Sequence, residues 1–301
     1  MKVAAPGKLL LAGAYAVLEG APAVVVAVDR YAVADGDRRA ARPTPEVRAA
    51  LGSADAPEVD ASALRDSGLK LGLGSSAAML VASLGVVHAR AGEDLRAPEV
   101  RRALFDEARA AHAQVQSGGS GVDVAASVHG GVLEYALAPD GSARADRIDS
   151  LPPGLVLDVF WCGVPATTTG MRELVLGLRR RDAGVHRARI DAIGEAARAA
   201  VTAARAGSLH GFVEAARRGA EALDALGRDA DAPIFPEATA GLVRLAEADD
   251  GAFLPSGAGG GDVFVHVGAR EASARFVQAA AAVGMRRLAM HPDTEGVHRT
   301  L

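Results

Sequence analysis

The stretch KLGLGSSAA at residues 70–78, followed directly by MLVASLGVVHA at residues 79–89, places two glycines and two serines at the start of an apolar run. Residues 75–90 have the composition of a helix that is apolar on nearly every side, which predicts burial between layers. A glycine turn before a helix lets the backbone approach a ligand closely. The first N–H groups of that helix have no internal partners and lie at its positive end. Residues 72–76 therefore predict a phosphate-binding loop.

The two serines of this loop allow more than one role. The hydroxyls of Ser75 and Ser76 can cap the helix, bond phosphate oxygens or bind a magnesium ion. An ordinary helix cap after a glycine turn is the alternative for this segment taken alone. The segment is neither a Walker A loop, which ends in Gly-Lys-Ser/Thr, nor a dinucleotide fingerprint, whose third glycine is missing.

Composition restricts the class of protein. The chain has 301 residues, 50% of them hydrophobic, which is enough for one large domain or two medium ones. The net charge of -4 comes from interspersed charges, so we expect a small-molecule partner and neither a nucleic-acid nor a membrane surface. The one cysteine, Cys162, excludes an internal disulfide. Gly, Lys and Pro interrupt the apolar run of residues 1–20, which does not fit a signal peptide or a membrane span, so we expect a cytoplasmic protein. We also expect a monomer or a homodimer.

Hydrophobic patterns predict an α+β chain in two parts. Strands are expected at residues 2–13, 22–36, 130–137, 154–164, 262–268 and 285–290, and helices at 75–90, 98–114, across most of 171–249, and at 271–284. Residues 38–68 carry three prolines and many charges, which indicates a peripheral excursion. The SLPPG segment at residues 150–154 divides the chain into predicted domains 1–153 and 154–301.

Two further glycine-rich segments accompany the first. APGKLLLAG at residues 5–13 sets a lysine after a Pro-Gly turn, and PSGAGGGD at residues 255–262 precedes a predicted strand. With GLGSSAA, they occur in the order found in the GHMP kinase superfamily, which the sequence resembles over most of its length. The resemblance implies a two-domain fold with the active site in the cleft between domains, and ATP and Mg²⁺ as cofactors.

Within that superfamily the sequence is most similar to the phosphomevalonate kinases, with the mevalonate kinases next. The similarity lies in residues 5–20, in AHAQVQSGGSGVDVAASVHGG at residues 111–131, in WCGVPATTTGMRELV at residues 161–175 and in residues 255–262. It implies ATP-dependent phosphorylation of 5-phosphomevalonate to 5-diphosphomevalonate, in the mevalonate route to isoprenoids. Mevalonate, homoserine or a sugar as acceptor, and a nucleotide-binding regulator without turnover, remain alternatives.

The resemblance also implies the site residues. Asp123 matches the catalytic aspartate, as a base or an orienting charge, and Lys8 matches the motif lysine that offsets negative charge. The implied ATP contacts are Gly72, Leu73, Gly74, Ser75, Ser76 and Ala77, with Ser76 on magnesium, and the implied substrate contacts are Lys8, His112, Gln116, Ser117, Ser120, Asp123, Gly257, Ala258 and Gly259. As alternatives, Asp123 begins a helix, Lys8 is a surface lysine, and His112 is a core histidine.

The sequence departs from the family pattern at three places. Ala14 stands where the family commonly has Glu, and Leu254 where a lysine often precedes the glycine-rich loop. The turn at residues 116–121 lacks the Lys or Asn often present there.

Overall fold

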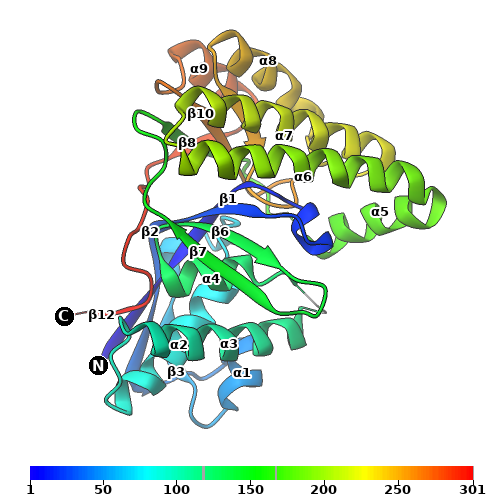
Figure 1. Cartoon of the computed structure of the whole chain (residues 1–301). Coiled ribbons are helices and arrows are strands. Elements are labelled where there is room, and N and C mark those ends of the chain that lie inside the picture. The colour runs from blue at the N-terminus through cyan, green and yellow to red at the C-terminus, as the bar shows by residue number, and fades with distance from the viewer. Residues whose placement is uncertain (117–118, 167, 301) are drawn as a thin grey trace. The chain divides into compact units, whose positions relative to one another are not determined.

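The computed structural model describes residues 1–116, 119–166 and 168–300, and Figure 1 traces their course. The helices are α1 (Pro45–Leu51), α2 (Ser75–Arg90), α3 (Pro98–Val115), α4 (Val122–His129), α5 (Thr168–Arg181), α6 (Ala183–Arg205), α7 (Leu209–Ala230), α8 (Ala240–Ala248) and α9 (Ala274–Ala282). The strands are β1 (Lys2–Ala12), β2 (Ala23–Arg39), β3 (Pro57–Asp60), β4 (Arg65–Asp66), β5 (Leu69–Lys70), β6 (Val132–Leu137), β7 (Ala143–Ile148), β8 (Val156–Trp161), β9 (Ala252–Pro255), β10 (Val263–Gly268), β11 (Arg286–Leu288) and β12 (His298–Thr300). Short 3₁₀ helices are η1 (Ala16–Glu19), η2 (Ser62–Leu64) and η3 (Glu237–Thr239). The predicted α+β class is confirmed.

The chain forms two compact units. Unit 1 comprises Met1–Leu9, Val25–Leu133 and Met290–Leu301, and unit 2 comprises Leu10–Val24 and Glu134–Ala289. This partition differs from the contiguous halves 1–153 and 154–301, because β1 and β2 each change unit partway along and the C-terminal segment returns to unit 1. The division into domains 1–153 and 154–301 stays a prediction.

The first sheet has the strand order β12-β1-β2-β6-β7, and β3 pairs with β2. Strand β12 runs antiparallel to β1, with Lys2 opposite Thr300 and Ala4 opposite His298. The first and last strands of the described chain are therefore neighbours in unit 1.

Helix α2 is the central helix of unit 1, as its apolar sequence predicts. Eleven of its residues are buried, and it packs against α1, α3 and α4, the blue-to-green group of helices in Figure 1. A side chain at Gly85 would lie 2.8 Å from Val3 Cγ1 and 3.0 Å from Val297 Cγ2. Glycine at this position thus permits the close contact of α2 with β1 and with Val297, the residue before β12.

The segment 38–68 contains more structure than its sequence predicts. The side chain of Thr44 caps α1 by accepting a hydrogen bond from the Val47 N–H, and β3 pairs with β2 through Val33 and Asp60. These elements are short, and tertiary contacts stabilise them more than local propensity does.

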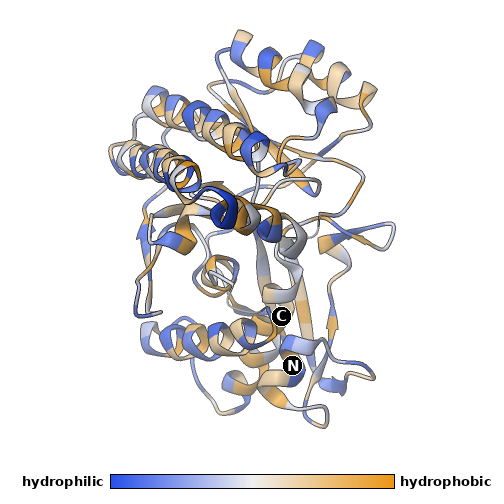
Figure 2. Cartoon of the chain, turned by 90° about the vertical axis from the view of Figure 1, so that its right-hand side faces the viewer, coloured by the Kyte–Doolittle hydropathy of each residue, from blue (hydrophilic) through white to orange (hydrophobic). Residues whose placement is uncertain are grey.

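Unit 2 contains a second sheet of order β11-β8-β10-β9. Phe160, Phe253, Phe264 and Phe276 pack in its core with ring centroids 5.2–6.1 Å apart. Long helices α6 and α7 pack together, and α7 also contacts β9. Figure 2 shows hydrophilic and hydrophobic residues alternating along the long helices, as expected for helices with one buried face. Among the described helices, none is long and apolar enough to cross a membrane.

Candidate active site

The predicted phosphate-binding loop forms a glycine turn that opens directly into α2. Gly72 and Gly74 both have positive φ, 80° and 76°. Gly74 is the N-cap residue of α2, and no side chain caps that end of the helix. The first N–H groups of α2 are therefore not occupied by a side-chain cap, which leaves them available to an anion.

The loop lies against Pro6–Lys8, which the sequence predicts as a Pro-Gly turn and which the structure shows as part of the continuous strand β1. The backbone N–H of Lys8 donates a hydrogen bond of 2.9 Å to the Leu73 carbonyl. A Cβ at Gly7 would come within 2.8 Å of that same carbonyl oxygen, so only glycine permits this approach. Lys8 itself is 8% exposed, and its Nζ donates to the Gly72 carbonyl at 3.3 Å. The interpretation of Lys8 as a surface lysine is wrong.

Helix α4 brings Asp123 to the same place. Gly121, with φ 77°, precedes the helix, and Asp123 lies in its first turn. A Cβ built on Gly74 would lie 3.2 Å from Lys8 Cγ and 3.3 Å from Asp123 Cβ. The glycine loop, the lysine and the aspartate, which are separated by up to 115 positions in the sequence, therefore meet around Gly74 within unit 1.

Ser127 makes a buried contact beside this site that the sequence reasoning missed. Its side chain is buried, and its Oγ donates a hydrogen bond of 2.8 Å to the Pro6 carbonyl. This bond ties the helix that carries Asp123 to strand β1, which carries Lys8. The available signal was its spacing: Ser127 follows Asp123 by one helical turn, so the two share a helix face.

The other predicted acceptor contacts of unit 1 have varied surroundings. His112 is buried, with Nε2 3.5 Å from Asp123 Oδ2. Gln116 Nε2 donates to Glu46 Oε1 at 2.8 Å, and Ser120 Oγ accepts from the Val122 N–H at 3.4 Å. Ser117 lies outside the described residues. Their roles as substrate contacts stay predictions.

The third glycine-rich loop belongs to unit 2. The Tyr15 hydroxyl donates a hydrogen bond of 2.5 Å to the Ala258 carbonyl, and burial raises the pKa of Tyr15, which keeps this donor protonated. A Cβ at Gly259 would lie 2.4 Å from the Ile234 carbonyl oxygen. Local packing thus requires glycine at 259, whereas the substrate contacts of Gly257, Ala258 and Gly259 stay predictions.

We expect Gly74→Ala to impair nucleotide binding beyond its effect on stability. An L-residue at this φ carries a strain of about 1–2 kcal/mol, and the new methyl group would press on Lys8 and Asp123. Gly92→Ala is the matched control, because Gly92 follows the other end of α2 at φ 83° with open space around it. Titration of a fluorescent ATP analogue should show at least a roughly 10-fold weaker affinity for Gly74→Ala only. Equal affinities in the two variants would contradict the loop's role.

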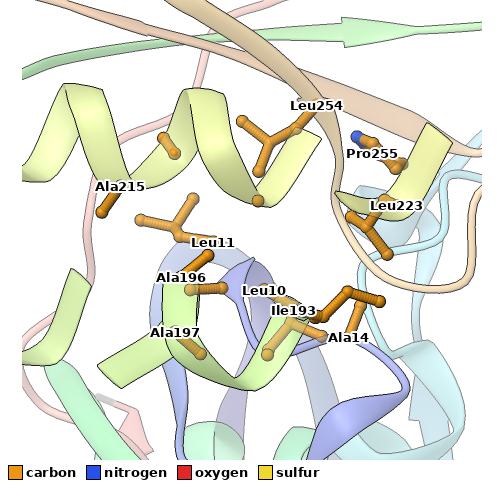
Figure 3. Close-up of a pocket in the computed structure, with 14 residues that line it drawn as sticks. Leu10, Leu11, Ala14, Ile193, Ala196, Ala197, Ala215, Leu223, Leu254 and Pro255 are labelled. Carbon is orange, nitrogen blue, oxygen red and sulfur yellow. The ribbon is translucent and has the colours of Figure 1, made fainter. Parts of the chain in front are cut away.

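The two single-residue departures from the family pattern line the same cavity in unit 2. Ala14 and Leu254 lie there with residues of β1, α6 and α7, as Figure 3 shows, and all 14 lining residues are apolar or glycine. The space inside is about 10 Å³, which is no more than the volume that one water molecule requires. Apolar packing therefore surrounds the position where the family commonly has Glu.

We expect Ala14→Glu to destabilise the protein by at least about 2 kcal/mol, because a carboxyl group would be buried among apolar side chains without a partner. Ala188→Glu, at an exposed position of α6, is the control. Thermal unfolding should show a clearly lower Tm for the first variant alone. An unchanged Tm would mean that a polar partner reaches Ala14.

Known proteins resemble this chain in both sequence and fold. The family model for the GHMP kinases N terminal domain matches residues 46–131. The chain is 31% identical to the phosphomevalonate kinase of Streptomyces sp. (strain CL190), over 97% of each chain. Among solved structures, a Lin0012 protein from Listeria innocua has a TM-score of 0.83 at 21% identity, with 99% of each chain covered. The Streptococcus pneumoniae phosphomevalonate kinase in complex with phosphomevalonate and AMPPNP has a TM-score of 0.79 at 18% identity, covering 97% of this chain and 99% of that one. Because the Streptomyces relative matches at this identity over nearly the whole chain, the protein belongs to the GHMP kinase family.

Proposed function

We propose that this protein transfers the γ-phosphoryl group of ATP to 5-phosphomevalonate and releases 5-diphosphomevalonate and ADP. The observation that carries the proposal is the 31% identity to a phosphomevalonate kinase over 97% of each chain. The grouping of the Gly72–Ser76 loop, Lys8 and Asp123 around Gly74 supports it independently, because phosphoryl transfer depends chiefly on positioning and charge compensation.

The nucleotide phosphates would bind at residues 72–77. Here the uncapped N-terminus of α2 offers backbone N–H groups and the positive end of the helix dipole. The buried Lys8 ammonium would offset negative charge on the transferred group. Lys8 is already held against the loop through the Gly72 carbonyl, so little rearrangement is needed for this role.

The residues present fit a magnesium ion that arrives with ATP. Among the described residues, no group of three or more His, Cys, Asp or Glu side chains could hold a metal by itself. Magnesium bound to a nucleotide needs few protein ligands, because phosphate and water oxygens supply the others. The half-buried Ser76, in the first turn of α2, would contribute its hydroxyl oxygen. The ion would neutralise phosphate charge during transfer.

The acceptor phosphate would lie beside Asp123. A phosphate oxygen forms a bond to the γ-phosphorus while the bond from that phosphorus to the β,γ-bridging oxygen breaks, and the electron pair leaves with ADP. A phosphate monoester has a second pKa of about 6 and is largely ionised near neutral pH. The attacking oxygen then has little need of a base, so Asp123 would chiefly orient the acceptor and the Lys8 charge. For an alcohol acceptor such as mevalonate, Asp123 would instead accept the hydroxyl proton.

The test is coupled ADP release with magnesium and ATP, comparing 5-phosphomevalonate, mevalonate, homoserine and several sugars at matched concentrations. We expect kcat/KM for 5-phosphomevalonate to exceed that for mevalonate by at least about 100-fold, since a site built for the phosphate leaves polar groups unpaired when it is missing. Turnover of a different acceptor would replace the proposed substrate. ATP binding without turnover of any acceptor would favour the regulator. The cytoplasmic location and the monomeric or homodimeric state stay predictions.

A further inference from the structure

We propose that His112 is a positioning residue, which holds the Asp123 carboxylate in place through its Nε2 atom and does not itself bind the acceptor. The proposal rests on the proposed kinase function, because it concerns how the aspartate of that site is oriented. It changes the interpretation of His112 from a substrate contact to a support behind the site.

The geometry joins the two side chains directly. His112 Nε2 lies 3.5 Å from Asp123 Oδ2, and the His112 and Asp123 side chains are 8% and 21% exposed. At this separation no water molecule fits between the two atoms. The distance is long for a hydrogen bond, but such contacts in ligand-free sites often shorten when substrate binds.

The rest of the imidazole is enclosed by the fold. Nδ1 is buried and has no hydrogen-bond partner among the described residues. A Cβ built on Gly119 would lie 3.7 Å from Nδ1, so the glycine turn before α4 lies against that edge of the ring. His112 therefore presents Nε2 to the carboxylate while its other nitrogen is covered.

The two oxygens of Asp123 have separate partners. Oδ1 accepts a hydrogen bond of 3.0 Å from the Val124 N–H at the start of α4, and Oδ2 faces His112. The contact also joins α3, which carries His112, to α4. A carboxylate that is hydrogen-bonded at one oxygen and faced by an imidazole nitrogen at the other has less rotamer freedom, which is the property required of a group that orients a substrate.

Three variants separate positioning from substrate binding. His112→Leu removes both ring nitrogens, His112→Gln keeps a donor near the Nε2 position, and His112→Asn keeps one only near the Nδ1 position. We expect kcat on 5-phosphomevalonate to fall roughly 10- to 100-fold in the Leu variant, to recover most of that loss in the Gln variant and to stay low in the Asn variant. KM for the acceptor should change less than about threefold.

A double-mutant cycle tests whether His112 acts through Asp123. In an Asp123→Asn background, His112→Leu should cost less than about threefold in kcat, since its partner has already lost its charge. If the losses of kcat caused by the two substitutions multiply in full, the proposal is overturned and His112 is a purely structural core residue. A higher acceptor KM with unchanged kcat would overturn it in favour of direct substrate binding.

A readout without turnover separates this proposal from the proposed function. The ¹⁵N signals of the His112 imidazole in the wild-type protein should report a proton on Nε2, and the Nε2 signal should move on Asp123→Asn substitution. An unmoved signal would contradict the contact even in an active enzyme. A moved signal in a protein that does not phosphorylate 5-phosphomevalonate would support the contact and reject the acceptor assignment.

Discussion

Replacing Asp123 with alanine is expected to lower turnover on 5-phosphomevalonate by at least about 100-fold, while ATP affinity changes little. The carboxylate lies at the start of α4, beside Lys8 and Gly74, and only partly exposed. Its removal would leave the Lys8 ammonium without an orienting negative charge and the acceptor without a fixed neighbour. Steady-state kinetics and an ATP-analogue titration on the same preparation give the two quantities.

Two companion variants make this result specific. Asp123→Asn keeps the shape of the side chain and removes its charge, so a loss as large as that of the alanine variant would assign the effect to charge. Asp106→Ala removes an exposed carboxylate from α3 and should leave turnover unchanged. Near-wild-type turnover of Asp123→Ala would show that Asp123 only begins a helix.

Replacing Lys8 with methionine should also lower kcat by about 100-fold or more. The methionine side chain fills a similar volume, so the change removes mainly the positive charge that would compensate the transferred phosphoryl group. Stability should fall little, because the bond from the Lys8 backbone N–H to the Leu73 carbonyl remains.

Lys2→Met is the matched control for this prediction. Lys2 lies on the same strand β1, but its side chain is exposed and it pairs opposite Thr300 at the edge of the sheet. A loss of kcat common to both variants would point to a general effect of charge on β1. Retained turnover in the Lys8→Met variant would contradict the proposed role of Lys8 in the site.

The sequence predicts the pieces of this site better than their arrangement. Helix α2 spans the predicted residues 75–90, because a glycine turn and a sustained apolar run are local signals. The burial of Lys8 beside the Gly72 carbonyl depends on a contact between residues that are 64 positions apart. Local sequence patterns do not encode such a contact. The family resemblance supplied the grouping of Lys8 with Asp123 that local patterns lacked.

Other features were beyond local signals for the same reason. Strand β12 has only three residues, all of them polar, and its pairing partner β1 lies at the other end of the described chain. At Ala14 the family resemblance was informative, but the surroundings of the residue could not be predicted. The missing Glu was evident from the resemblance, whereas the apolar cavity around this position required the structure.

The pairing of β1 with β12 bears on how the protein reaches its native state. Lys2 and Thr300 are opposite each other, so this edge of the sheet closes only through a contact of very high sequence separation. Such contacts slow folding, and until they form β1 exposes an unpaired edge that can pair with another chain. We therefore expect slow refolding that becomes aggregation-prone as protein concentration rises, with the C-terminal strand as the segment whose docking ends that exposure.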